Sequence, residues 1–189
     1  MPKRQPPKRS FLKKNLIRLL IARSDINAAL HACDLILQNV QGPKDKLLYP
    51  LTTSVVVCYS RPFTENEPHG SLPRKWTKFD NTKYQFTHDK LLQSRHQLFA
   101  HSDMNVRKAQ IVPPNVPLEI NEGTELKSPE ISTQVSYTLF EIDFFKIVRE
   151  TILDLGRRMQ AEISKLIIDL YGNINLPNNV FDIRVDEGL

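Results

Sequence analysis

Hydrophobic residues recur every three or four positions along two long stretches of the chain, which is the spacing of one buried face of an α-helix. The first stretch covers residues 11–40, with Ser10 as its N-cap and Gly42 at the point where it stops. The other runs from residue 136 or 137 to residue 171, with Gly172 as its C-cap. The pattern therefore predicts a long amphipathic helix near each end of the chain.

Two shorter helices are expected between them. Residues 47–59 form an apolar run whose β-branched side chains would also suit a buried strand. We prefer a buried helix, because Pro50 is typical of a first helical turn. A polar, proline-containing loop at residues 62–82 follows, and the next helical pattern runs from residue 81 or 82 to residue 102.

The pattern changes between residues 105 and 135, where Pro and Gly separate three short runs typical of strands. These runs are residues 109–112, 116–120 and 131–135. Four helices with short or irregular links predict a mainly α fold. We expect a four-helix up-and-down bundle with a small β-hairpin-like insertion before the last helix.

Positive charge is concentrated at the N-terminus. The net charge is +5, but residues 1–24 carry eight Lys or Arg and no acid, so the rest of the chain sums to −3. Such an arm favours nucleic acid, although a solvated tail is the commoner role of a basic segment. We expect a basic flexible tail at residues 1–10, a helical domain at residues 11–172 and a C-terminal tail at residues 173–189.

Several classes of protein are disfavoured by what the sequence lacks. There is no run of 18 apolar residues and no apolar signal region, so we expect neither a membrane span nor secretion. Two cysteines, Cys33 and Cys58, are too few for a disulfide framework and fit core thiols in a reducing cytoplasm. No metal, dinucleotide or P-loop motif occurs, so we expect no metal and no cofactor.

One position breaks the pattern of its helix. At about 100° per residue, the apolar residues 91, 92, 98 and 99 define the buried face of the third helix, and Arg95 falls in the middle of it. A guanidinium stays charged, so burying it requires an anionic or carbonyl partner. A purely structural Arg95 would form an internal salt bridge, for example with a carboxylate on the long helices, or would snorkel to solvent; a functional Arg95 would meet a ligand phosphate in a cleft. His101, about 120° away near the helix end, is a candidate acid and base.

The segment Arg95-His-Gln-Leu-Phe-Ala-His101 resembles the motif of the HEPN domain (higher eukaryotes and prokaryotes nucleotide-binding), in which an Arg and a polar residue precede a His. Ala-His-Ser-Asp at residues 100–103 is similar to the abortive-infection branch of that superfamily. Tyr59-Ser-Arg-Pro-Phe63 also resembles bacterial members. The four-helix layout extends the resemblance over about residues 11–171.

The resemblance implies a metal-independent endoribonuclease that works as a homodimer, with the motifs of two chains facing each other in a shared cleft. Arg95 would stabilise the scissile phosphate, and His101 would act as acid and base. A ribose 2′-OH would attack the adjacent phosphate and leave a 2′,3′-cyclic phosphate and a 5′-OH end. A toxin or an antiphage-defence component is implied, with RNA and an antitoxin protein as partners.

Other residues are candidates for supporting roles. His96 occupies the variable polar position of the motif, and Ser102 follows His101. Asp103 would either hold the imidazole or belong to a turn. Candidate RNA-binding residues combine positive charge with one aromatic ring: Lys13, Lys14, Arg74, Lys75 and Trp76. Anchoring of its loop on the bundle is at least as good an account of Trp76.

Two alternatives to a nuclease stay open. HEPN domains also serve as non-catalytic helical modules that bind a nucleotide or a partner protein. In the second alternative the chain is an unrelated helical bundle and Arg95 forms a structural ion pair. Arg95 would then contact a buried carboxylate.

Overall fold

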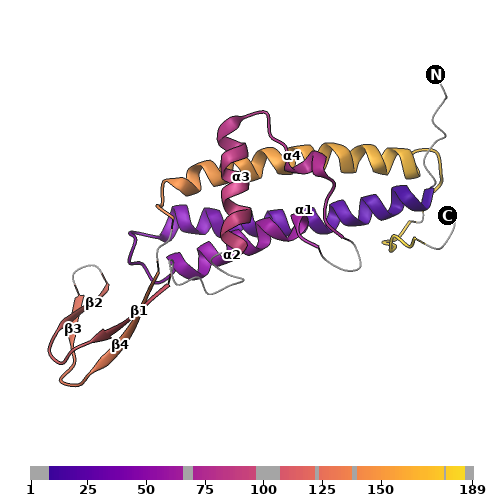
Figure 1. The fold of residues 1–189 in the computed structure, drawn as a ribbon. Helices are drawn as coiled ribbons and strands as arrows, with labels where there is room; N and C mark the ends of the chain where they lie inside the picture. Colours follow the sequence, from indigo (N-terminus) through magenta and orange to yellow (C-terminus); the bar gives the residue numbers. More distant parts are fainter. Residues whose placement is uncertain are drawn as a thin grey trace.

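The computed structural model describes residues 9–65, 70–96, 107–121, 124–137, 140–176 and 178–185. Within them the chain forms four α-helices, two short 3₁₀ turns and four short strands (Figure 1). In chain order these are α1 Arg9–Asn39, α2 Leu48–Ser60, 3₁₀ turns Arg61–Phe63 and Arg74–Thr77, α3 Thr82–Ser94, β1 Arg107–Val112, β2 Pro117–Asn121, β3 Thr124–Lys127, β4 Ser132–Tyr137 and α4 Phe144–Tyr171.

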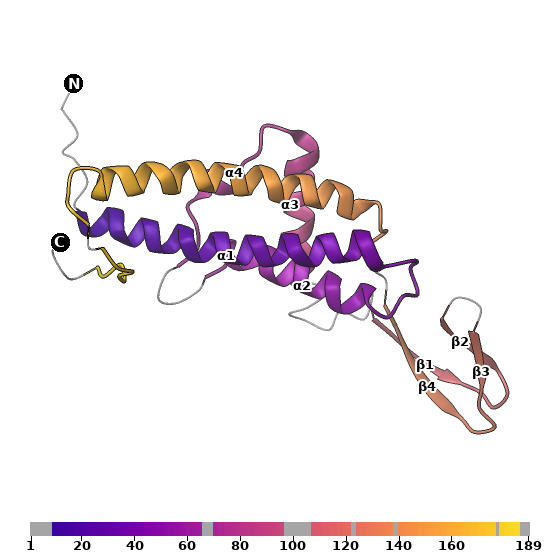
Figure 2. The ribbon, with the colours of Figure 1, turned by 180° about the vertical axis from the view of Figure 1, so that it is seen from behind.

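The two long helices, α1 and α4, lie side by side and antiparallel (Figures 1 and 2). At one end the Arg9 guanidinium donates to the Leu170 carbonyl over 3.1 Å. Toward the other end the Cys33 thiol donates to the Phe145 carbonyl over 3.2 Å. Burial raises the pKa of Cys33 to about 12, with nearby Asp34 adding to the effect, so the thiol stays protonated. Cys33 is therefore a core residue, as the sequence predicts.

The seam between these helices is formed by the apolar faces that the periodicity predicts. On α1 small side chains alternate with larger ones, which lets the helices approach closely. The buried apolar positions of α1 are Leu16, Leu19, Ala22, Ile26, Ala29, Ala32, Cys33 and Ile36. Those of α4 are mostly large: Phe145, Val148, Ile152, Leu155, Met159, Ile163, Leu166, Leu170 and Tyr171.

Residues 48–60 are helical, as predicted, in spite of their β-branched content. Pro50 lies in the first turn, where its missing N–H costs no helical hydrogen bond. The next helix also begins where the sequence indicates. The Asn81 side chain accepts a hydrogen bond from the Lys83 backbone N–H over 2.9 Å and caps α3.

The predicted start of the last helix is wrong by about seven residues. Residues 132–137 belong to β4, which pairs antiparallel with β1 in a register that places Arg107 opposite Tyr137 and Val112 opposite Ser132. Helix α4 begins only at Phe144. Period-two alternation in 131–137 runs into the helical pattern without a Gly or Pro, so the sequence carries no local signal for the boundary.

The strands form an arm that extends from the helices at the end where α1 finishes and α4 begins (Figure 2). It consists of two antiparallel two-stranded ladders, β1–β4 and β2–β3. Asn115, in the turn between β1 and β2, has a φ of 64°, a left-handed conformation that Asn tolerates better than most residues.

The prediction of a mainly α fold with a small antiparallel β part is confirmed. The finer prediction, four helices that alternate up and down, is not shown. Helix α3 crosses α1 and α4 steeply instead of running along them (Figure 1). Among the described residues, no helix combines the length and apolar character needed to cross a membrane.

Truncation of the α1–α4 seam should be far more destabilising than the same truncation on the outer face of α4. Ile152 has no exposed surface, whereas Ile168 is 67% exposed. We expect Ile152→Ala to lower the free energy of unfolding by about 2–5 kcal/mol, through lost burial and a residual cavity. Ile168→Ala is the matched control and should change it by about 0.5 kcal/mol or less. Urea denaturation followed by circular dichroism measures both, and equal effects would contradict the seam described above.

Candidate functional site

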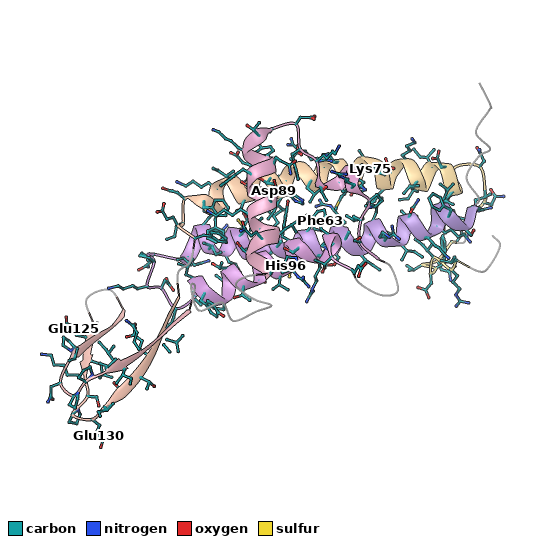
Figure 3. All side chains as sticks on the ribbon, viewed as in Figure 1. Phe63, Lys75, Asp89, His96, Glu125 and Glu130 are labelled. Atoms are coloured by element: carbon teal, nitrogen blue, oxygen red, sulfur yellow. The ribbon has the colours of Figure 1, made fainter. Side chains whose placement is uncertain are left out.

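Helix α3 carries the first half of the Arg–His motif at its C-terminal end. His88 and Leu91 are buried on one face of this helix, and Arg95, one turn after Leu91, is half-buried. His96 is exposed. Figure 3 shows His96 at the end of α3 that lies near α1 and α2. Arg95 therefore lies where the buried face of α3 reaches the surface, and its side chain is partly accessible.

The backbone at this point departs from a regular α-helix. The Arg95 N–H is shared between the carbonyls of Leu91 and Leu92. Residues 95–96 then widen into a π-type turn. Turns of this kind are rare and are often found at functional sites.

The Arg95 guanidinium has no hydrogen bond and no ion pair within the part of the chain that the structure describes. The ion pairs found there use other cations: Arg61, Lys75, Lys146, Arg149, Arg157 and Arg158. The internal carboxylate that a structural ion pair of Arg95 requires is therefore not found among the described residues. His101, Ser102 and Asp103 lie outside them, so the other half of the motif stays a prediction.

One turn below the Leu91–Arg95 surface lies a buried aromatic cluster around His88. Its Nδ1 shares a 2.9 Å hydrogen bond with the Tyr59 hydroxyl of α2. The Phe63 and Phe79 rings lie 4.8 and 5.4 Å from the imidazole, centroid to centroid. Among the described residues, nothing hydrogen-bonds to Nε2.

The pKa of His88 is lowered from 6.5 to about 4, chiefly by burial; the Asp89 charge opposes this shift, and the Arg158 charge contributes to it. The imidazole is thus neutral at physiological pH. Its hydrogen bond with Tyr59 joins α3 to α2, and the buried imidazole is not available as an acid or base. The sequence analysis did not predict the Tyr59–His88 hydrogen bond. Two residues of the aromatic cluster, Tyr59 and Phe63, are the first and last residues of the Tyr-Ser-Arg-Pro-Phe segment.

The prediction that Trp76 stacks on RNA is not supported by its surroundings, because the ring is only 5% exposed. The Lys75 ammonium lies 5.3 Å and the Arg158 guanidinium 5.7 Å from the ring centroid. Arg158 also donates to the Lys75 carbonyl over 3.0 Å and lies over Phe79. Trp76 anchors its loop on α4, which is the alternative account of this residue.

The other candidate RNA-binding residues fall into two groups. Lys13 is buried, and a buried ammonium cannot neutralise a phosphate on the surface, so its assignment is wrong. Lys14, Arg74 and Lys75 are exposed, and Lys75 contacts Glu162 over 2.9 Å. Adjacent helical positions face different directions, and Lys13 lies on the same face as buried Leu16 and Leu19, whereas Lys14 does not.

Comparisons of the chain with protein-family models, with curated proteins and with solved structures found no match. No group of three or more His, Cys, Asp or Glu side chains suited to a metal ion occurs among residues 9–65, 70–96 and the later described segments.

The buried, neutral His88 should make stability depend on pH. Because its pKa is lower in the folded than in the unfolded chain, its contribution is complete above pH 6.5 and falls as pH drops toward about 4. The loss over this window should amount to roughly 3 kcal/mol. We expect His88→Leu to flatten the dependence of unfolding free energy on pH between 6.5 and 4. His31→Ala removes an exposed histidine and should leave the slope intact, so an equal flattening by both would refute the assignment.

Removal of Arg95 should cost little stability. With no ion-pair partner in the described structure, Arg95→Ala should lower the free energy of unfolding by about 1 kcal/mol or less. A buried carboxylate left without its partner would instead cost about 3–5 kcal/mol. Urea unfolding at pH 7 distinguishes the two. Arg149→Ala, which breaks the 2.7 Å contact with Asp34, is a reference for the loss of an exposed pair.

Proposed function

We propose that this protein is a metal-independent endoribonuclease of the HEPN type, built on a HEPN-like helical domain, and that it acts as a toxin or an antiphage-defence component. The observation that carries the proposal is the half-exposed Arg95 guanidinium at the end of the apolar face of α3, which has no ion-pair partner among the described residues. A guanidinium placed there is available for a bidentate contact with a ligand phosphate.

The proposed reaction needs a cation for the phosphate, a proton acceptor and a proton donor. Arg95 would make a bidentate contact with the scissile phosphate and stabilise the charge that grows on its oxygens. His101 would take the proton from the ribose 2′-OH, whose oxygen attacks the phosphorus. A second His101, from a partner copy, would give a proton to the departing 5′-oxygen. The products are a 2′,3′-cyclic phosphate and a 5′-OH end.

The neighbourhood of Arg95 supports this division of roles. His88, on the same face of α3, is buried and holds Tyr59. It is therefore a positioning residue that fixes the helix carrying Arg95. The acid–base role falls to the motif histidine, with exposed His96 beside Arg95 to orient the substrate. Placement of Arg95 on a helix held by buried contacts favours a fixed geometry for the phosphate.

Direct assay of RNA cleavage tests the proposal. In buffer with EDTA, the wild-type chain should cleave RNA and leave 2′,3′-cyclic phosphate ends, detected by their resistance to ligation or labelling. Arg95→Ala and His101→Ala should each lower the rate by at least about 100-fold, because each removes a group that acts in the transition state. Arg95→Lys should recover little activity, since an ammonium cannot make the forked contact.

Lys83→Ala is the matched control, because it removes an exposed cation from the first turn of the same helix and should keep activity. Circular dichroism and melting of each variant show that the fold is retained. Expression in a bacterial host adds a second readout, with slower growth for the wild type than for His101→Ala. A wild-type chain that binds RNA or nucleotide without cleaving it would support a non-catalytic HEPN module instead.

A further inference from the structure

The β arm is acidic and exposes apolar side chains. Its outer part, residues 116–131, carries four Glu and one Lys, a net charge of −3. Glu125 and Glu130 both lie on this part of the arm (Figure 3). Ile131 is 71% and Leu126 is 54% exposed.

The apolar residues of the arm share faces. In the β2–β3 ladder Leu118 is directly opposite Leu126, so the two lie on one face, whereas Glu125 and Lys127 lie on the other. In the β1–β4 ladder Ile111 and Val135 also share a face, and Ile111 is 75% exposed. A two-stranded ribbon is marginally stable by itself in water, and gains stability when such a face is covered.

A partly apolar cavity lies at the end of the α1–α4 pair that is away from the arm. A cavity of about 520 Å³ lies between the first turns of α1, the last turns of α4 and the loop before Trp76. Its apolar lining includes Phe11, Leu12, Leu19, Leu72, Trp76 and Leu166. Phe11 is largely exposed, so part of this lining is open to a partner.

The charges around the cavity are mainly positive. Arg18, Lys75 and Lys165 line it, against Glu162, which already contacts Lys75, and Asp169. Within the described part of α1 no acid occurs before Asp25, so its first turns add no negative charge to the cavity. A segment that is both apolar and acidic would therefore match the apolar lining of the cavity and the cations around it.

We propose that the arm of one copy of this chain docks into the α1–α4 cavity of a second copy. The Leu118–Leu126 face would cover the apolar floor, while Glu125 on the opposite face and Glu130 in the turn after β3 would add the negative charge that the rim cations attract. Arm and cavity lie at opposite ends of the helical pair, so the contact joins different surfaces of the two chains. When both arms exchange, the contacts close into a symmetric dimer. The docking does not depend on ribonuclease activity.

Charge reversal with rescue tests the contact on the full chain. Sedimentation velocity and light scattering should show a dimer that weakens as salt rises. Glu125→Lys with Glu130→Lys should raise the dimer dissociation constant about tenfold or more, and so should Arg18→Glu with Lys165→Glu. A mixture of the two variants should restore dimers, because one contact in the mixed dimer is wild-type and the other pairs reversed charges.

Asp80→Lys with Glu141→Lys is the control, since it makes the same change of charge at exposed positions outside the arm. It should leave the dimer unchanged. A wild-type chain that stays monomeric overturns the proposal. So does a dimer that survives reversal of the arm charges, which would place the interface elsewhere. Because the proposed cleavage uses a histidine from each copy, loss of the dimer should lower cleavage too, whereas His101→Ala should abolish cleavage and keep the dimer, which separates failure of the docking from failure of the ribonuclease.

Discussion

Close packing of α1 against α4 is the constraint on which the other elements depend. The small side chains Ala22, Ala29 and Ala32 on α1 leave room for the large side chains of α4. On α4, Gly156 leaves space for a side chain of α1, because a Cβ at that position would overlap the Arg23 guanidinium. Helix α2 then packs on α1, and α3 packs across α4 and α2. The site at the end of α3 is thus built on a platform of two helices from opposite ends of the chain.

Two sets of polar contacts hold α3 in this place. The Tyr59–His88 hydrogen bond ties its middle to α2. Two residues after His88, and about 200° around the helix from it, the Lys90 ammonium lies 5.3 Å from the Phe140 ring centroid and 5.0 Å from that of Phe144, which joins α3 to the start of α4. A helix fixed from two sides presents Arg95 without an ion-pair partner among the described residues. His88 and Lys90 stabilise α3, and in the proposed function Arg95 is available to a ligand phosphate.

Much of this architecture can be predicted from local patterns, because burial of one face dictates the spacing of apolar residues. That reasoning identified α1, α2 and the capped start of α3, and it singled out Arg95 as a conflict with its face. It failed where information is not local. The α4 boundary depends on β4 pairing with β1, and the burial of Lys13 and Trp76 depends on which helix lies against them. The His88–Tyr59 bond joins residues 29 positions apart and leaves no periodic signal.

Arg95 and the β arm pose the same physical problem in different terms. Within the described part of a single chain, Arg95 has no anionic partner and the ribbon has apolar faces in water. A two-fold dimer would cover the arm of each copy and would bring a second Arg95, because each residue of one copy has an equivalent in the other. Arms exchanged between two copies would fix their relative orientation, and the two Arg95 side chains would then be related by that same axis. The proposed reaction uses two cations and two imidazoles in one cleft, so the proposed assembly that stabilises the arm would also be one in which the proposed motif is complete.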